Sequence, residues 1–247
     1  MDNSITLVDY MGSDEMHGLA AWASTFAEFN IEMPDTNRVD VLVNHILNNG
    51  KKKKSIEELL AFLAENKHNS PFRFSSFVFT ATTDIATHIQ KLKHTVLLEA
   101  ENGESARYKE LKEDKFYLPW DWSGIEFDDS KFSPEVAKIF NGFETWKQIL
   151  ERSSEINNEL YHNCLDQLVP VLGRKRAKES ARYFKMYNSQ MNTLNKLSFD
   201  GIVQFYYKRH DANVAQTEIA EFANGMVNQI KAIPGNPFKY SLKAFNL

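Results

Sequence analysis

The sequence predicts an α+β fold that is rich in helices and has a small central sheet of mixed or antiparallel strands. Most apolar residues recur at the spacing of helices. Only three segments, residues 5–10, 70–83 and 115–119, have the alternation or the β-branched and aromatic residues of strands. The length of 247 residues suits one large domain or two small ones.

Composition argues against several classes of protein. The formal net charge of -4 disfavours a general nucleic-acid binder, because a polyanion usually needs a basic face. Cys164 is the only cysteine, so the chain has no internal disulfide and no CxxC metal site. There is no apolar run of membrane-spanning length and no signal-peptide pattern at the N-terminus. We therefore expect a cytoplasmic protein without membrane or nucleic-acid partners.

The first elements follow from simple patterns. Residues 5–10 alternate as a first strand, and a helix begins near Asp14. Apolar residues at helical spacing predict a second helix over 35–49, and the lysine run at 49–54 predicts a solvated loop.

The next elements begin at recognisable caps. Ser55 and Glu58 form a capping box that opens a helix. The aromatic and β-branched segment 70–83 predicts a strand, after which Asp84 is placed to cap a helix over 85–94.

The second half is mainly helical. After a short strand at 115–119, Ser133 and Pro134 predict a helix start, and its continuation is expected to run to about Leu168. A further helix opens near Arg174. Helices are also predicted over 198–209 and 214–233, followed by an irregular tail. The apolar stripe of the last helix consists of Ile219, Phe222, Ala223, Met226, Val227 and Ile230.

Polar residues gather in one segment that fits no regular period, residues 93–108. Asn102, Glu104, Ser105 and Arg107 place donors, acceptors and a fixed cation beside Gly103, which permits close backbone approach. A hydroxyl and a planar guanidinium at alternating positions suit a phosphate. The alternative is an ordinary polar turn.

Other polar groups also allow two interpretations. Gln90, Lys93 and His94 share one helix face, which is a ligand-binding face or simply a solvated one. Glu179 and Arg182 fit an ion pair between neighbouring helix turns. The run 208–210 places cations at a helix C-terminus, where they favour the helix dipole.

Several common sites are absent from the sequence. There is no GxGxxG, Walker or HExxH motif. His162 and Cys164 are two positions apart and would point in different directions on a helix, so they predict no metal site. Cys164 has no motif around it that marks a nucleophile.

Taken together, these segments resemble the flavin-dependent thymidylate synthases. Residues 67–74, "KHNSPFRF", resemble that family's HxSPFEH stretch, while "QKLKHT" and "NGESARY" resemble the two ends of its RHRxxSxNExSxRY signature. "ESARYF" and "KRHDANVAQTEI" resemble its ExAR segment and its closing arginine-containing run. The resemblance spans about residues 5 to 232 in the right order, and it implies a single domain of this fold over 1–247.

The resemblance implies roles for individual residues. Arg209 and Ser105 would be catalytic. The dUMP-binding positions would be Gln90, Glu104, Ser105, Arg107, Arg182 and Arg209. The FAD-binding positions would be His68, Lys93, His94, Asn102, Glu179, Ser198 and Gln204. The signature segment would be an irregular substrate loop rather than a helix or strand.

The chain also departs from the family pattern, mainly on the flavin and folate side. Lys93 and Thr95 replace the two signature arginines, and Gly103 occupies the strict position of the signature glutamate. The other replacements are Trp22 for arginine, Arg73 and Phe74 for Glu and His, and Ser198, Asp200 and Gln204 for Asn, Arg and Asn. The loop from His94 to Asn102 is longer and carries Glu99 and Glu101, and an extra residue lets Lys208 or His210 compete with Arg209.

The implied activity is reductive methylation of dUMP to dTMP, with FAD as cofactor and NADPH and 5,10-methylenetetrahydrofolate as co-substrates. The resemblance also implies a homotetramer with active sites between subunits. Two alternatives stay open: C5 hydroxymethylation of a pyrimidine nucleotide on the same scaffold, and a non-catalytic nucleotide-binding protein.

Overall fold

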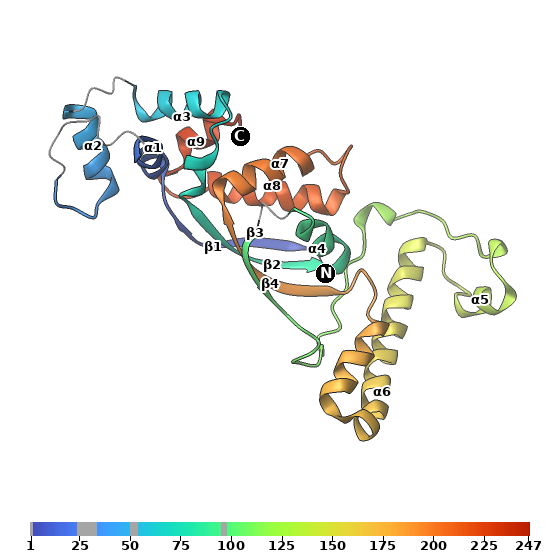
Figure 1. The fold of residues 1–247 in the computed structure, drawn as a ribbon. Coiled ribbons are helices and arrows are strands. Elements are labelled where there is room, and N and C mark those ends of the chain that lie inside the picture. Colours follow the sequence, from blue (N-terminus) through green and yellow to red (C-terminus); the bar gives the residue numbers. More distant parts are fainter. Residues whose placement is uncertain (1, 24–33, 50–53, 95–97) are drawn as a thin grey trace. The chain divides into compact units, whose positions relative to one another are not determined.

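The computed structural model describes residues 2–23, 34–49, 54–94 and 98–247 (Figure 1). Most of the predicted lysine loop, together with Thr95, lies outside the described residues.

A four-stranded antiparallel sheet confirms the predicted α+β class. Its strands are β1 (Ser4–Met11), β2 (Ser76–Asp84), β3 (Leu98–Gly103) and β4 (Gln190–Ser198), in the order β1-β2-β4-β3. The central strand β2 buries Phe77 and Phe79 completely, which is expected for β-branched and aromatic residues on a covered sheet face.

The helices account for most of the remaining chain. They are α1 (Asp14–Trp22), α2 (Val39–Asn49), α3 (Ile56–Glu65), α4 (Ile85–Leu92), α5 (Pro134–Ile139), α6 (Trp146–Ala181), α7 (Phe199–Arg209), α8 (Thr217–Lys231) and α9 (Lys239–Ala244). The predicted caps are confirmed: Ser55 and Glu58 close a capping box on α3, Ser133 caps α5, and Asp84 accepts from the Thr87 N–H at 2.9 Å.

The chain forms two compact units. Unit 1 consists of residues 1–4, 82–89 and 103–193, and unit 2 of residues 5–81, 90–102 and 194–247. Unit 2 holds the larger apolar core, in which the predicted stripe of α8 is buried in full. A short 3-10 helix, η2 (Ser70–Arg73), leads into β2 in this unit.

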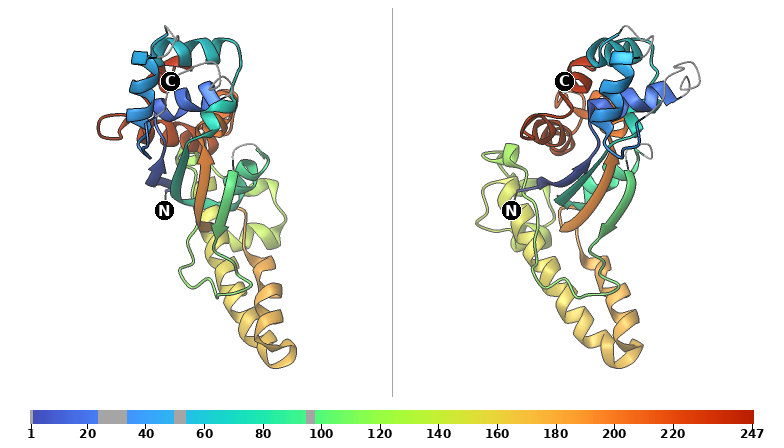
Figure 2. Two further views of the ribbon diagram at one scale, coloured as in Figure 1. Left: turned by 60° about the vertical axis from the view of Figure 1, so that its left-hand side comes forward. Right: turned by 90° about the vertical axis from the view of Figure 1, so that its left-hand side faces the viewer.

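In unit 1, α6 forms a helical hairpin. Gly173 has φ 74° and ψ 154°, so the helix turns back on itself there, and Figure 2 shows the two arms side by side. Tyr161 and Leu165 of the first arm pack with Ala177 and Ala181 of the second. A helix therefore restarts at Arg174, as the sequence predicted.

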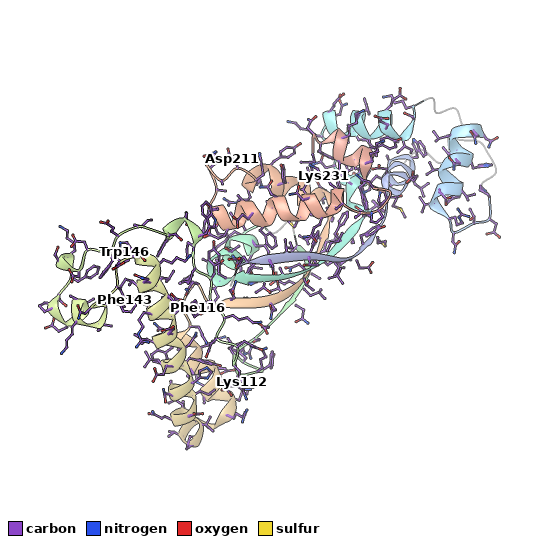
Figure 3. All side chains as sticks on the ribbon, turned by 180° about the vertical axis from the view of Figure 1, so that it is seen from behind. Lys112, Phe116, Phe143, Trp146, Asp211 and Lys231 are labelled. Carbon is purple, nitrogen blue, oxygen red and sulfur yellow. The ribbon has the colours of Figure 1, made fainter. Side chains whose placement is uncertain are left out.

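An aromatic cluster surrounds Trp146, the first residue of α6. The Trp146 ring lies 5.1 Å from the Phe127 ring at 90° and 6.0 Å from Phe132, and Phe140 lies 6.3 Å from Phe143. Figure 3 labels Trp146 and Phe143. Edge-to-face contacts of this kind favour one arrangement of the rings.

Several predicted strand boundaries were wrong. Residues 70–73 form η2 rather than strand, because Pro71 occupies its first turn, and the strand begins only at Ser76. Residues 115–119 form no strand; their pairing is a single bridge from Phe116 to Ser189. The polar segment after His94 is not irregular throughout, since residues 98–103 pair with β4 as strand β3.

Helix boundaries also required correction. The predicted helix 35–49 begins only at Val39. The helix from Ser133 does not continue to Leu168, because α5 ends at Ile139 and Gly142, with φ 88°, precedes a new start at Trp146. Strand β4 and helix α9 were not predicted, since "QMNTLNKLS" reads as polar and the tail contains two prolines.

Candidate functional site

A turn after β3 carries two of the predicted nucleotide-binding residues. Tyr108 N–H donates to the Ser105 carbonyl at 3.0 Å, which closes the turn, and Arg107 N–H donates to Ser105 Oγ at 3.3 Å. The Arg107 side chain is 48% exposed. A hydroxyl and a guanidinium are therefore held together at the surface of unit 1.

The second arm of α6 contacts this turn. Lys178 Nζ donates to the Tyr108 carbonyl at 2.7 Å, and Arg107 Nε lies 3.4 Å from Glu179 Oε1. Arg182, at the end of the same arm, is exposed. The turn and this arm thus bring Ser105, Arg107, Glu179 and Arg182 into one region of unit 1.

Glu179 does not form the predicted ion pair with Arg182. Its carboxylate lies instead near Arg107 and, at 3.6 Å, near Arg176. Burial would raise the pKa of Glu179, but the hydrogen bond from Arg107 and the cations of the arm outweigh it and keep the pKa low. Ion pairs this exposed contribute little to stability, so Arg107 can exchange Glu179 for a ligand at small cost.

Glu104 is engaged within the protein. Its carboxylate accepts from Lys109 Nζ at 2.6 Å and from the Asn192 backbone N–H at 2.9 Å. Although burial opposes it, these donors lower the pKa of Glu104. At Gly103, a Cβ would lie 3.0 Å from Thr193 Cγ2, so a larger residue there would force Thr193 of β4 to shift.

Unit 2 joins two other predicted residues. Arg209 Nε, at the end of α7, donates to His94 Nε2 at 2.9 Å, and the His94 ring packs edge-to-face on Phe205 with centroids 5.0 Å apart. Burial, together with Arg209 and Lys208, lowers the pKa of His94. The imidazole is consequently neutral near neutral pH and can accept this hydrogen bond.

Of the three competing residues at this helix end, Arg209 is the one directed to His94. His210 stacks on Tyr206 with centroids 4.5 Å apart and contacts its carbonyl, while Lys208 is exposed. Gln90 of α4 donates to Gln216 Oε1, just before α8.

Lys91 was not singled out by sequence reasoning, although it anchors this region of unit 2. Its Nζ is buried, donates to Asn195 Oδ1 at 2.6 Å and lies 2.9 Å from Glu101 Oε2. Burial lowers the pKa of Lys91, and Glu101 opposes that effect. The ion pair therefore holds Glu101 of β3, next to Asn102, against α4, which carries Gln90. The helical pattern carried no signal for it, because Lys91 shares a face with the polar Thr87 and His88, and this polar face is the buried one.

The α7 positions expected to face a flavin are turned inward. Ser198 Oγ caps the helix by accepting from the Gly201 N–H at 3.2 Å. Asp200 is 0% exposed and accepts from Gln204 Nε2 at 2.8 Å, from Asn69 Nδ2 at 3.0 Å and from Arg73 Nε at 2.8 Å. The sequence does not predict the Arg73–Asp200 pair, although both positions depart from the family pattern with opposite charges.

Unit 2 still offers groups that fit an FAD molecule. Its exposed side chains include the cations Lys93 and Arg73, the imidazole of His68 and the 55% exposed ring of Phe74. Asn102 is exposed on β3. Cations suit a diphosphate and aromatic groups suit a flat ring system, whereas Ser198 and Asp200 are already used inside the protein.

The described residues were also compared with the patterns of metal sites and of membrane-spanning helices. Within the described ranges, no cluster of three or more His, Cys, Asp or Glu side chains could hold a metal ion. The helices of the described part include none long and apolar enough to cross a membrane.

Comparisons with known proteins identify relatives over most of the chain. The family model described as "Thymidylate synthase complementing protein" matches residues 6–234. The chain is 25% identical over 197 residues to the flavin-dependent thymidylate synthase of Clostridium tetani, covering 76% of this chain and 72% of the relative. It is 27% identical over 173 residues to that of Thermosipho melanesiensis, covering 70% of each.

The fold has a solved counterpart. The crystal structure of the UMP/dUMP methylase PolB from Streptomyces cacaoi, bound with 5-Br dUMP, aligns with a TM-score of 0.66 at 22% identity. The alignment covers 99% of this chain and 95% of that one.

Proposed function

Because the chain belongs to the thymidylate synthase complementing protein family, we propose that it is a flavin-dependent thymidylate synthase that converts dUMP to dTMP. The observation that carries the proposal is the family match over residues 6–234, which contains every residue with a proposed role. The side chains of Ser105, Arg107 and Arg182 in unit 1 support the proposal, because a hydroxyl and two guanidinium groups suit a nucleotide phosphate.

The residues of unit 1 have a phosphate-binding role in this proposal. Ser105 supplies a hydroxyl donor, and Arg107 and Arg182 supply planar guanidinium groups that match a phosphate in two-point contact. Lys178 positions the turn by its bond to the Tyr108 carbonyl. Glu104 acts on the nucleotide only indirectly, because it is held by Lys109 and Asn192.

The residues of unit 2 act on the base and the cofactor. Arg209, oriented by His94, stabilises the negative charge that develops on the pyrimidine, an electrostatic contribution. Gln90 contacts the nucleotide, while His68, Lys93 and Asn102 hold FAD. Bound FAD supplies the electron-transfer chemistry, with NADPH as reductant and 5,10-methylenetetrahydrofolate as the one-carbon donor.

No protein nucleophile is needed on the base. Cys164 lies half-buried in α6, against the apolar cluster around Tyr161, where it acts as a packing residue. Among the described residues of that cluster there is no base of the kind that activates a catalytic thiol.

A second candidate is C5 hydroxymethylation of a pyrimidine nucleotide. The inward orientation of Ser198 and Asp200 favours it, because a changed flavin side alters the reduction of the transferred carbon.

Product mass tests the proposal. The chain is incubated with dUMP, or with dCMP, together with FAD, NADPH and 5,10-methylenetetrahydrofolate, and the nucleotide is analysed by mass spectrometry. The proposal predicts a gain of CH2 on dUMP. A gain of CH2O would establish the hydroxymethylase, and an unchanged nucleotide that still binds would indicate the non-catalytic alternative.

A further inference from the structure

An arginine on the surface of unit 2 is held by a carboxylate that has no contact with solvent. The Asp200 side chain is 0% exposed, whereas that of Arg73 is 57% exposed. The two residues lie 127 positions apart in the sequence, yet Arg73 Nε lies 2.8 Å from Asp200 Oδ2. Asn69 and Gln204 donate to the other oxygen, Oδ1, at 3.0 and 2.8 Å.

This arrangement stabilises a buried charge and orients an exposed one. A carboxylate buried without donors would be strongly destabilising, but here one cation and two amides satisfy it. Because the bond uses Nε, the two terminal nitrogens of Arg73 have no hydrogen-bond partner among the described residues. The guanidinium plane is fixed, and its outward edge is available to a ligand.

A fixed guanidinium suits an anion better than a mobile one. An ordinary surface arginine loses rotamer freedom when it binds, and that loss weakens binding. In Arg73 the buried carboxylate has already restricted the side chain. The planar edge that remains presents parallel N–H groups, which match two oxygens of a phosphate.

The neighbouring surface indicates which kind of anion fits. Arg73 ends the segment that also exposes His68 and Ser70, and Phe74 follows it with 55% of its surface exposed. An exposed guanidinium and an exposed aromatic ring at consecutive positions of the chain suit a ligand that combines phosphate with a flat ring, as a flavin nucleotide does.

We propose that Arg73 is an anion-binding residue, positioned by Asp200, that receives a phosphate of the flavin cofactor. This inference rests on the proposed function for the identity of the cofactor. The charges at positions 73 and 200 are the reverse of those in the family pattern, so the cation belongs to η2 here instead of α7. Arg73 and Asp200 together therefore keep one cation and one carboxylate, with their positions exchanged.

Affinities for three ligands test the inference. Binding of FAD, riboflavin and inorganic pyrophosphate is measured by calorimetry for the wild-type chain and for Arg73→Gln. We expect the substitution to weaken FAD and pyrophosphate by about tenfold or more, as for the loss of a charge-assisted contact. Riboflavin, which lacks phosphate, should change by less than about twofold.

Two further variants separate positioning from simple charge. Asp200→Asn keeps the charge of Arg73 but weakens its anchor, so FAD should weaken by about threefold to tenfold while riboflavin is unaffected. Arg38→Gln is the matched control, because Arg38 is also an exposed arginine paired with an aspartate, Asp40, at 2.6 Å. It should leave all three affinities unchanged. Thermal unfolding without ligand shows whether each variant is folded.

The possible outcomes distinguish this inference from the proposed function. Equal loss of FAD and riboflavin in Arg73→Gln, or no loss of either, overturns the phosphate role. If the wild type binds pyrophosphate through Arg73 but no flavin, the anion site stands and the flavin-dependent function fails. A wild type that binds neither flavin nor pyrophosphate overturns both.

Discussion

The imidazole of His17 is buried completely between two hydroxyl groups. Its Nδ1 lies 2.8 Å from Ser241 Oγ and its Nε2 2.8 Å from Ser75 Oγ, while Ser241 also donates to Asp14. Burial lowers the pKa of His17 to about 3. The group thus links α1, α9 and the residue before β2, and it is neutral in the folded protein.

A pH-dependent stability follows from that neutral imidazole. The unfolded histidine gains a proton near pH 6.5 while the folded one does not. Stability is therefore full above that pH and is lost progressively as the pH falls toward 3, by about 2 kcal/mol at about pH 5. Urea unfolding of His17→Gln should show less stability at about pH 7.5 and a flatter pH dependence.

Asp14 does not account for a difference in pH dependence between the wild type and His17→Gln. Burial raises its pKa, an effect of opposite sign, but Asp14 is present in both proteins. An unchanged slope in His17→Gln would mean that His17 is not the group responsible.

The proposed nucleotide site depends most on Arg107. Replacement by alanine removes a charge-assisted contact with phosphate, so the dissociation constant for dUMP should rise by about tenfold or more. Titration calorimetry measures it. Arg152→Ala, which removes another exposed arginine paired within unit 1, should have no effect. Full dUMP affinity in Arg107→Ala would contradict the assignment.

At the residue scale, the sequence predicted what was local. Ser105 and Arg107 are two positions apart, and the structure joins them by a hydrogen bond within one turn. Two pairings, Asp200 with Arg73 and Lys91 with Asn195, were not predicted, because they join residues 127 and 104 positions apart and depend on how the chain folds. Burial of a charged group follows from tertiary packing and not from spacing.

At the scale of elements, β3 and β4 approach closely at Gly103. In Gly103→Ala the new Cβ would lie 3.0 Å from Thr193 Cγ2. Overpacking of this kind should lower the free energy of unfolding by about 1–3 kcal/mol, measured by urea denaturation. Thr193→Ser removes the obstructing methyl group and should recover part of the loss in the double variant.

The single variant Thr193→Ser completes a double-mutant cycle. If the two single effects simply add, the steric explanation for Gly103 is wrong.

Elements with strong local signals were predicted well. The capping box of α3 and the apolar stripe of α8 are both present as expected. Strand β4 was missed because its sequence alternates weakly, and it forms by pairing between β2 and β3. Partners distant in the sequence therefore determine this strand, as is common for strands.

At the scale of the whole molecule, we expect four copies to associate. Family resemblance implies a homotetramer, and closed symmetric oligomers commonly place sites at subunit interfaces. Sedimentation equilibrium should give four times the mass of the chain, independent of loading concentration over a tenfold range. A monomer at all concentrations would contradict the expectation.

The family was predictable from the sequence because five weak motifs occur in order, and the family match confirms it over residues 6–234. The inward orientation of Ser198 and Asp200 was not predictable, because tertiary packing and not local sequence determines it.

Visible absorption of the purified protein tests the central claim most directly. The chain is mixed with FAD, free flavin is removed, the spectrum is recorded, and dUMP is then added. We expect a retained flavin band that changes on addition of dUMP, because the proposed reaction requires the flavin and the nucleotide to come together. A colourless protein, or a flavin band that dUMP leaves unchanged, would contradict it.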